Sequence, residues 1–170
     1  MELNKKIASV CFTGHRELTN TEIHIISHRL TFLLKKLILE HELTNCFAGG
    51  AVGFDTVAAK NVLSLKDDYP ALKLHLILPC QGQEKSWNVL QKQEYEIIKE
   101  RADTVRVLAP FFYNGCMQAR NRELLRNTDL CIAYLRKGTK SGGSLNTVLQ
   151  AAKLGIPVIN IAENESEDIL

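Results

Sequence analysis

The 170-residue sequence lacks an apolar run long enough to cross a bilayer: runs such as LHLILP fall far short of the roughly 20 residues that a membrane helix needs. It also lacks a basic and apolar leader followed by a small-residue cleavage site. The formal net charge is only +2, so charge alone indicates no general affinity for polyanions. These absences predict a cytoplasmic globular protein with no membrane partner.

Metal-binding and disulfide-forming patterns are missing as well. The five cysteines are odd in number and form no Cys-x-x-Cys pair, so neither a disulfide framework nor a zinc site is predicted. Cys11, Cys46 and Cys131 fall in strand-like apolar segments, which favours buried, unreactive side chains. His24 and His28 have the spacing of two ligands on one helix face, but no third ligand accompanies them. We therefore predict no metal and no cofactor.

What the sequence contains is a regular alternation of strand-like and helix-like segments. Residues 7–12 form the first predicted strand, and Thr19 with Glu22 has the capping-box form at the start of the first predicted helix. That helix carries the apolar stripe Ile23, Ile26, Leu30, Leu33 and Leu37. The later predicted strands are TNCFAGG, LKLHLILP, TVRVLA, DLCIAYL and IPVINIA; the later predicted helices are GFDTVAAKNVLSL, SWNVLQKQEYEIIKERA, NGCMQARNRELLRN and SGGSLNTVLQAAKLG.

This alternation predicts an α/β fold with a doubly wound, mostly parallel sheet, because strands joined through helices pair in parallel by right-handed crossovers. The strands are apolar runs rather than alternating ones, which indicates helices on both faces of the sheet. We expect a single domain over residues 1–170, with its core at about 7–161 and an acidic tail at 163–170.

The distinctive residues gather in loops that follow strands, which is where such sheets bind ligands. Thr13-Gly14-His15-Arg16 follows the first predicted strand, and GGAVGFD follows the second. Two predicted helices begin with glycines, at Gly49, Gly50 and Gly53 and again at Gly142 and Gly143. Glycine-headed helices direct backbone N–H groups at anions, although plain tight turns are the alternative. Neither head has the Walker A or the Gly-x-Gly-x-x-Gly spacing.

Basic side chains near the second glycine pair extend the anion-binding prediction. Residues 120–140 include six basic residues and only two acidic ones. The basic residues are Arg120, Arg122, Arg126, Arg136, Lys137 and Lys140, and the acidic ones are Glu123 and Asp129. The planar fork of arginine suits phosphate, so Arg120 and its neighbour Asn121 are predicted ligand contacts, whereas Arg126 is predicted to be surface.

Three further residues each have two interpretations. Asp55 either stabilises the start of its helix or accepts a hydrogen bond from a ribose hydroxyl. Trp87 either stacks on a base or packs in the core, and His15 either closes its loop or exchanges a proton. No serine-centred nucleophile elbow and no pair of facing carboxylates is evident. Catalytic residues therefore stay unassigned, with Asp55 and His15 as the candidates.

Over about residues 7–161, the chain resembles the YpsA-like branch of the SLOG superfamily. The resemblance rests on five motifs in the same order: FTGHR, AGGAVGFDTVAA, EKSWNVLQKQEYE, MQARNREL and SGGSLNTVLQAAKLGIPV. The resemblance implies a Rossmann-like fold and a sensor or adaptor that binds a nucleotide or an ADP-ribose-like derivative, with a link to bacterial cell division. Related families and the apolar third predicted helix favour a homodimer. With the residue-based reasoning, the expected ligand-binding set is Thr13, Gly14, Arg16, Gly49, Gly50, Gly53, Asp55, Trp87, Arg120, Asn121, Gly142, Gly143, Ser144 and Thr147.

Two other SLOG branches supply alternative functions. LOG phosphoribohydrolases split nucleoside monophosphates, and Arg120 resembles an assisting arginine of that branch. Aligned on Thr147, however, the position of their motif glutamate holds Gln150, which cannot ionise. The DNA-processing protein A branch holds single-stranded DNA, but 6% aromatic residues and a small net charge make nucleic acid the least favoured ligand. Binding is thus the leading prediction, with N-glycosidic hydrolysis as the alternative.

Overall fold

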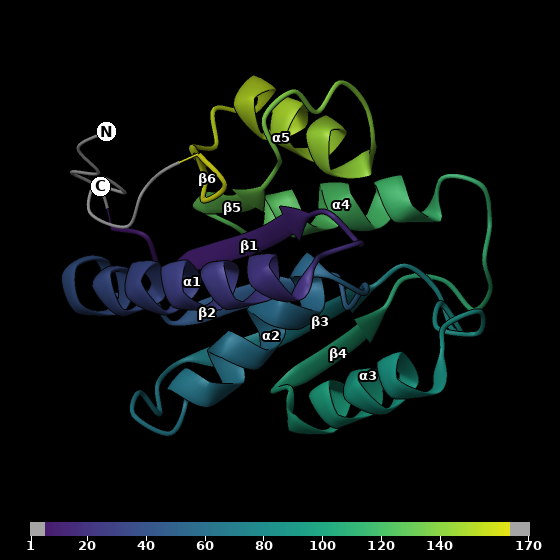
Figure 1. The fold of residues 1–170 in the computed structure, drawn as a ribbon, viewed down its shortest axis with the longest axis horizontal. Helices are drawn as coiled ribbons and strands as arrows, with labels where there is room; N and C mark the ends of the chain where they lie inside the picture. Colours follow the sequence, from purple (N-terminus) through teal and green to yellow (C-terminus); the bar gives the residue numbers. More distant parts are fainter. Residues whose placement is uncertain (1–5, 164–170) are drawn as a thin grey trace.

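The computed structural model describes residues 6–163, so the predicted acidic tail lies, apart from Glu163, outside the described residues (Figure 1). Strands and helices alternate along the chain as the sequence pattern predicts. Their order is β1 (Ser9–Gly14), α1 (Asn20–His41), β2 (Asn45–Ala48), α2 (Phe54–Leu65), β3 (Lys73–Leu78), α3 (Val89–Arg101), β4 (Thr104–Val107), α4 (Cys116–Arg126), β5 (Leu130–Tyr134), α5 (Gly143–Lys153) and β6 (Val158–Asn160).

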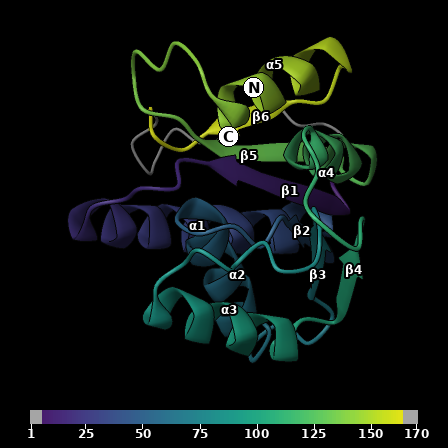
Figure 2. The same ribbon diagram turned by 90° about the vertical axis from the view of Figure 1, so that its right-hand side faces the viewer.

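The six strands form one parallel sheet in the order β4-β3-β2-β1-β5-β6. Helices α1, α2 and α3 cover one face, and α4 and α5 pack on the other (Figure 2). The chain changes face between β4 and β5, so the carboxyl ends of β1 and β5 meet at the topological switch point. The predicted doubly wound, Rossmann-like α/β fold is confirmed.

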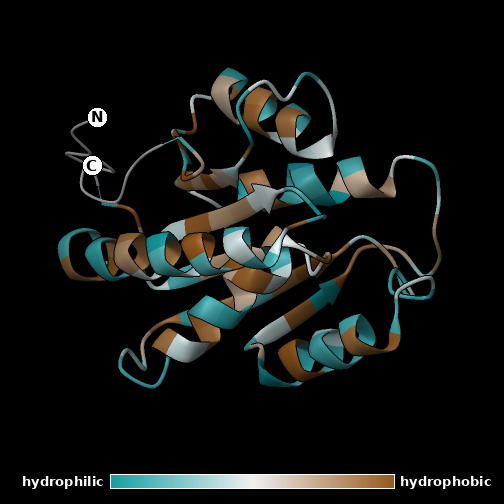
Figure 3. Ribbon diagram, viewed as in Figure 1, coloured by the Kyte–Doolittle hydropathy of each residue, from teal (hydrophilic) through white to brown (hydrophobic). Residues whose placement is uncertain are grey.

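Helix α1 shows how the sequence pattern produces the core. Its capping box is formed as predicted, because the Thr19 side chain accepts from the Glu22 amide and the Glu22 carboxylate accepts from the Thr19 amide. Its buried stripe is Ile26, Leu30, Leu33, Leu34 and Leu37. The predicted stripe was wrong at its first member, since Ile23 lies on the flank of the helix and is 36% exposed. All five cysteines are buried, and Figure 3 shows the apolar residues concentrated on the strands and the inward helix faces.

Two element boundaries differ from prediction in ways that matter for the site. Strand β1 ends at Gly14 rather than at Phe12, because parallel pairing with β5 continues through Thr13 and Gly14. Helix α3 begins at Val89, after a capping box made by Asn88 and Gln91. Trp87 therefore lies before the helix rather than on it.

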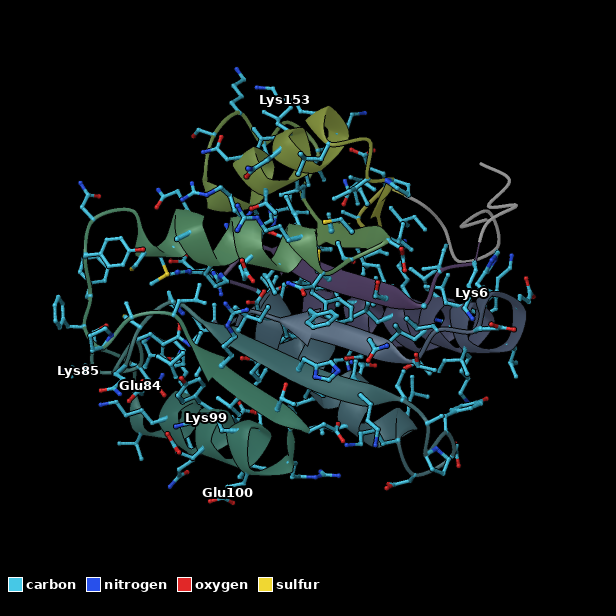
Figure 4. All side chains as sticks on the ribbon, turned by 180° about the vertical axis from the view of Figure 1, so that it is seen from behind. Lys6, Glu84, Lys85, Lys99, Glu100 and Lys153 are labelled. Atoms are coloured by element: carbon cyan, nitrogen blue, oxygen red, sulfur yellow. The ribbon has the colours of Figure 1, made fainter. Side chains whose placement is uncertain are left out.

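The face that carries α4 and α5 is not covered evenly. Seen from behind, α4 lies across the sheet, and its Leu124 and Leu125 pack in one buried cluster with Ile77 of β3, while the edge strand β4 lies below the helix (Figure 4). All four residues of the edge strand β4 are exposed. The labelled charged residues, such as Lys6, Lys99 and Lys153, lie at the periphery of the molecule (Figure 4). Within residues 6–163, no helix combines the length and the apolar character that a membrane crossing requires.

Candidate functional site

A cavity of about 280 Å³ opens at the carboxyl end of β1, beside the switch point. Three regions of the chain line it: the end of β1 with its loop, the inner face of α4, and the segment 139–145 that leads into α5. Asp55, from the first turn of α2, reaches it from the neighbouring loop. In Figure 1 these elements converge at the right-hand side, where β1 ends and where α4 and α5 begin. The fold thus brings residues from positions 12 to 145 to one concave surface.

The beginning of α5 presents unused hydrogen-bond donors to this cavity. Its N-cap, Gly142, has φ +120° and no side chain with which to accept from the first turn. Among the described residues, no protein group accepts from the backbone N–H groups of Gly143, Ser144 or Leu145. The Ser144 hydroxyl donates to the Gly14 carbonyl at 2.7 Å, which holds the helix beginning against the end of β1. Free N–H groups and the positive end of the helix dipole make this an anion-attracting surface.

A buried ion pair forms the floor of the cavity. Arg120 Nη1 lies 3.5 Å from Asp55 Oδ2, and the two side chains are only 7% and 8% exposed. Burial raises the pKa of Asp55, and the Arg120 and Arg16 charges oppose that shift. Burial also lowers the pKa of Arg120, with Asp55 opposing the change. Arg16 therefore lies close enough to influence both charges, so two guanidinium groups and one carboxylate meet at this cavity.

Three hydrogen bonds hold Arg120 and Asp55 in place. Arg120 Nη1 donates to the Gly49 carbonyl at 2.7 Å, and its Nε donates to Asn121 Oδ1 at 2.7 Å. Asp55 Oδ2 accepts from the Ala51 amide at 3.3 Å. A Cβ on Gly49 would overlap the Arg120 guanidinium, so glycine is required there to admit the arginine. Gly49 thus positions a ligand candidate and does not itself line the cavity.

The first amide of the first glycine-headed helix is used within the protein and is not available to a ligand. The first amide of α2, on Phe54, donates to the His15 carbonyl at 3.0 Å. A Cβ on Gly53 would overlap the carbonyls of His15 and Arg16, so this glycine permits two backbone segments to touch. The Gly50 carbonyl accepts from the Gln83 side chain at 3.1 Å. The glycines before α2 therefore serve backbone packing, and the first amide of α2 is used within the protein, whereas the first three amides of α5 are not used within the part of the chain that the structure describes.

His15 closes the loop rather than standing free to exchange protons. Its Nε2 accepts from the Arg136 backbone N–H at 3.0 Å, and the Thr139 hydroxyl lies 3.4 Å from the same nitrogen. The ring also packs edge-on against Tyr134. Burial, followed by the nearby Arg136 charge, lowers the pKa of His15, which favours the neutral ring that these contacts need. This arrangement ties the loop after β1 to the loop after β5.

Arg16 is the exposed cation at the mouth of the cavity. Its guanidinium lies 3.8 Å from the Met117 sulfur, and within the described residues no carboxylate pairs with it. Arg136, one of the six basic residues counted between positions 120 and 140, is already paired: its Nε donates to Glu22 at 2.6 Å, and its Nη2 donates to the Glu17 carbonyl. Arg126 pairs with Glu123 at the surface, as predicted. The basic segment thus contributes less positive charge to the cavity than its composition suggests.

The structure brings ten of the residues singled out from the sequence to one cavity: Thr13, Gly14, His15, Arg16, Asp55, Arg120, Asn121, Gly142, Gly143 and Ser144. Five others, Gly49, Gly50, Gly53, Trp87 and Thr147, do not line it. Trp87 packs edge-on against Tyr95, with ring centroids 5.2 Å apart, and joins the main core. Thr147 is buried and accepts a hydrogen bond from Asn121 at 2.8 Å, in a smaller cavity described below.

Several lining residues escaped the sequence reasoning, among them Met117, Thr139, Ser141 and Leu145. Met117 lies three residues before Arg120, and this helical spacing is the signal that could have placed it on the same face of α4. Among residues 6–163, no group of three or more His, Cys, Asp or Glu side chains is arranged to hold a metal ion. The cavity therefore combines amides, hydroxyls, guanidinium groups and one carboxylate, a donor-rich set suited to phosphate and sugar oxygens.

Comparison with known sequences identifies similar proteins across most of the chain. A family model for YpsA, described as the YspA SLOG family, matches residues 10–155. A UPF0398 protein from Brevibacillus brevis is 36% identical over 93 residues, covering 54% of this chain and 50% of that protein. Another from Shouchella clausii is 29% identical over 143 residues, covering 76% of this chain and 74% of its own. The chain spans about half the length of the first of these relatives.

One solved structure has a similar fold. The X-ray structure of TM1055, a structural genomics target, superimposes with a TM-score of 0.54 and 20% sequence identity. The match covers 88% of this chain and 71% of that one. At this identity the likeness establishes the arrangement of strands and helices and nothing about ligands.

Proposed function

The chain belongs to the YspA SLOG family, and we propose that its 280 Å³ cavity binds the phosphate and ribose of a nucleotide or an ADP-ribose-like derivative. The observation that carries the proposal is the meeting of three free amides of α5 with the guanidinium groups of Arg16 and Arg120 around that cavity. Backbone amides at a helix beginning and arginine forks are both recurrent phosphate ligands.

The carboxylate gives the cavity a second kind of contact. Asp55 Oδ2 accepts from Ala51 and faces Arg120, which leaves acceptor capacity on its carboxylate. A ribose hydroxyl could donate to that carboxylate while the phosphate lies at the α5 amides. A sugar phosphate thus matches the polar groups of the cavity better than a bare inorganic anion does.

Binding without turnover is the form of the proposal that the side chains favour. His15, one catalytic candidate, has its Nε2 occupied by a backbone amide, and Asp55, the other, is held by an ion pair. We accordingly infer a sensor or adaptor that binds its ligand without converting it chemically. The link to cell division remains part of this proposal.

A phosphoribohydrolase is the second candidate, because a buried carboxylate beside a sugar site could stabilise an oxocarbenium-like transition state. Asp55 is the residue that would do so. Gln150, at the position of the LOG glutamate, does not line the main cavity and cannot supply that charge. Incubation with nucleoside monophosphates, NAD and ADP-ribose, followed by chromatography, separates the candidates. If the chain turns over one of these compounds and Asp55→Asn abolishes that turnover, hydrolysis replaces binding as the proposed function.

A thermal-shift screen with the same compounds tests binding directly. A ligand present at about 100 times its Kd stabilises the folded chain by about 2.7 kcal/mol. Arg16→Ala should weaken nucleotide binding about tenfold or more without lowering stability, because Arg16 is exposed and forms no ion pair among the described residues. Arg122→Ala is the matched control: it removes the same charge from an exposed position of α4 that does not line the cavity. No response to any compound would refute the proposal, and retention on single-stranded oligonucleotides would favour nucleic acid instead.

A further inference from the structure

A second, smaller cavity of about 60 Å³ lies between α4 and α5 and adjoins the main one. Met117, Asn121 and Gly143 line both cavities, so the two are neighbouring parts of one surface. The remaining lining residues of the smaller cavity are Gln118, Asn146, Thr147 and Gln150. The small cavity therefore contains amide and hydroxyl groups with one thioether and no charged side chain, in contrast to the cationic main cavity.

Two of these polar groups are already used within the protein. Asn121 donates to the Thr147 hydroxyl at 2.8 Å, and that hydroxyl donates to the Gly143 carbonyl at 2.9 Å. Asn121 also accepts from Arg120 Nε, so its side chain links the small cavity to the buried ion pair. These contacts fix the wall between the cavities.

The other three amides have no such partners. Among the described residues, no protein group donates to or accepts from the side-chain amides of Gln118, Asn146 or Gln150. Asn146 and Gln150 are four residues apart and share one face of α5, and Gln118 approaches from α4. Each side-chain amide carries a donor and an acceptor side by side, which is the pattern that pairs with the amino group and ring nitrogen of adenine.

We propose that this amide-lined cavity between α4 and α5 is the base subsite of the nucleotide site, and that it takes the edge of an adenine. The inference rests on the proposed function, because it assumes that sugar and phosphate occupy the main cavity. Met117, which lines both cavities, supplies a polarizable surface for the face of the ring. The uncharged amides recognise the base, and the cationic main cavity holds the phosphate.

The volumes agree with this division. The main cavity, at about 280 Å³, lies just below the range of about 300 to 1,000 Å³ that is usual for small-molecule sites, so a whole nucleotide derivative needs adjoining space. The small cavity is open to solvent at its exposed rim residues Gln118 and Asn146, so it receives the edge of a base rather than enclosing it. A nucleotide that spans Met117 would thus have its base beside the uncharged amides of the small cavity and its sugar phosphate in the cationic main cavity.

The test compares AMP, UMP and ribose 5-phosphate by isothermal titration calorimetry on the complete chain. Unaltered protein should bind AMP about tenfold or more tightly than ribose 5-phosphate, and more tightly than UMP. The double variant Gln118→Met with Asn146→Leu keeps approximate side-chain size at two exposed positions while removing both amides. It should lose the preference for AMP and keep its affinity for ribose 5-phosphate. Gln93→Met, on the exposed surface of α3, is the control and should change neither affinity.

Three results would overturn the inference. Equal affinities of the unaltered chain for AMP and ribose 5-phosphate would mean that the base makes no contact. An unchanged AMP preference in the double variant would place the base elsewhere. If ribose 5-phosphate and AMP both fail to bind the unaltered chain, the base subsite is refuted, and the proposed function fails as well only when NAD and ADP-ribose also do not bind. Thermal unfolding of each variant shows that the fold is retained.

Discussion

Arg120 Nη1 and Asp55 Oδ2 lie 3.5 Å apart with both side chains more than nine-tenths buried, and they come from helices on opposite faces of the sheet. The pair joins α4 to α2 through the gap beyond the carboxyl ends of the strands. Because Arg120 also donates to Gly49, one side chain links three segments of the site. The charges that we propose for ligand binding therefore also connect these segments of the fold.

Removing one member of this pair should destabilise the protein strongly, because the other charge would stay buried without its partner. We expect Asp55→Asn and Arg120→Met each to lower the free energy of unfolding by about 3 kcal/mol. The double variant should cost less than the sum of the two, since no lone charge remains buried. Urea denaturation of the four proteins measures the coupling. Strictly additive losses would show that the two side chains do not interact.

Substitution by alanine should have different effects on stability at Gly49 and at Gly143. Gly49→Ala should lower the free energy of unfolding by about 1 to 3 kcal/mol, because its Cβ would overlap the Arg120 guanidinium and force it to move. Gly143→Ala should leave stability nearly unchanged, since nothing lies within 4 Å of its Cβ position. Thermal denaturation of the two variants is the measurement. Equal stability losses would contradict the assignment of Gly49 to admitting the arginine.

These two glycines show what the sequence could and could not predict. The spacing of apolar residues and the turn and capping residues between them predicted every strand and helix. They also predicted the sheet edge at which the polar loops meet. A glycine before a helix, however, either frees amides for a ligand or lets backbones and side chains approach closely. Gly143 begins a helix whose first amides have no acceptor among the described residues, whereas Gly49 and Gly53 permit close approach, and only the neighbours in space distinguish the two cases. Sequence order does not contain those neighbours.

Arg136 and Trp87 also have partners that the local sequence does not reveal. Arg136 pairs with Glu22, which lies 114 residues earlier, so a local count of basic residues could not reveal that its charge is used. Trp87 was counted among possible stacking residues, but its partner is Tyr95 in the core. Arg120 and Asn121, by contrast, both line the cavity, because they lie on a helix that begins at the sheet edge. Local sequence patterns thus predicted where a residue lies in the fold better than they predicted which side chains it contacts.

The Glu22 pair makes stability depend on acid pH. Hydrogen bonds from Arg136, then from the Thr19 amide, lower the pKa of Glu22 below its ordinary 4.5. The folded state therefore binds fewer protons than the unfolded state, so this stability is complete above about pH 4.5 and is lost as the pH falls below it. Glu22→Gln keeps a capping side chain but removes the charge, and should cost roughly 1 kcal/mol or less at pH 7.

The measurement for Glu22 is the melting temperature of the two proteins between pH 7 and pH 3. Their difference should shrink as the pH falls below about 4.5, because the unfolded form of the unaltered chain takes up a proton there that the folded form resists. Glu42→Gln, at an exposed pair with Lys6, serves as the control for the loss of a surface carboxylate. A difference that stays constant over this range would mean that the Glu22 charge does not contribute.

His15 should impose a pH dependence in a higher range. Burial lowers its pKa from the ordinary 6.5, so the folded state again binds fewer protons than the unfolded state. Stability should consequently fall as the pH drops through 6.5, where the unfolded ring takes up a proton that the folded ring resists. The structural reason is that His15 Nε2 accepts from the Arg136 amide and cannot do so once protonated. His15→Gln retains an acceptor and does not titrate, so it should reduce the change in unfolding free energy between pH 7 and pH 5.5. Nitrogen NMR of the imidazole should report an unprotonated Nε2 at pH 7, and a protonated Nε2 there would contradict the role of His15 as the acceptor that joins the two loops.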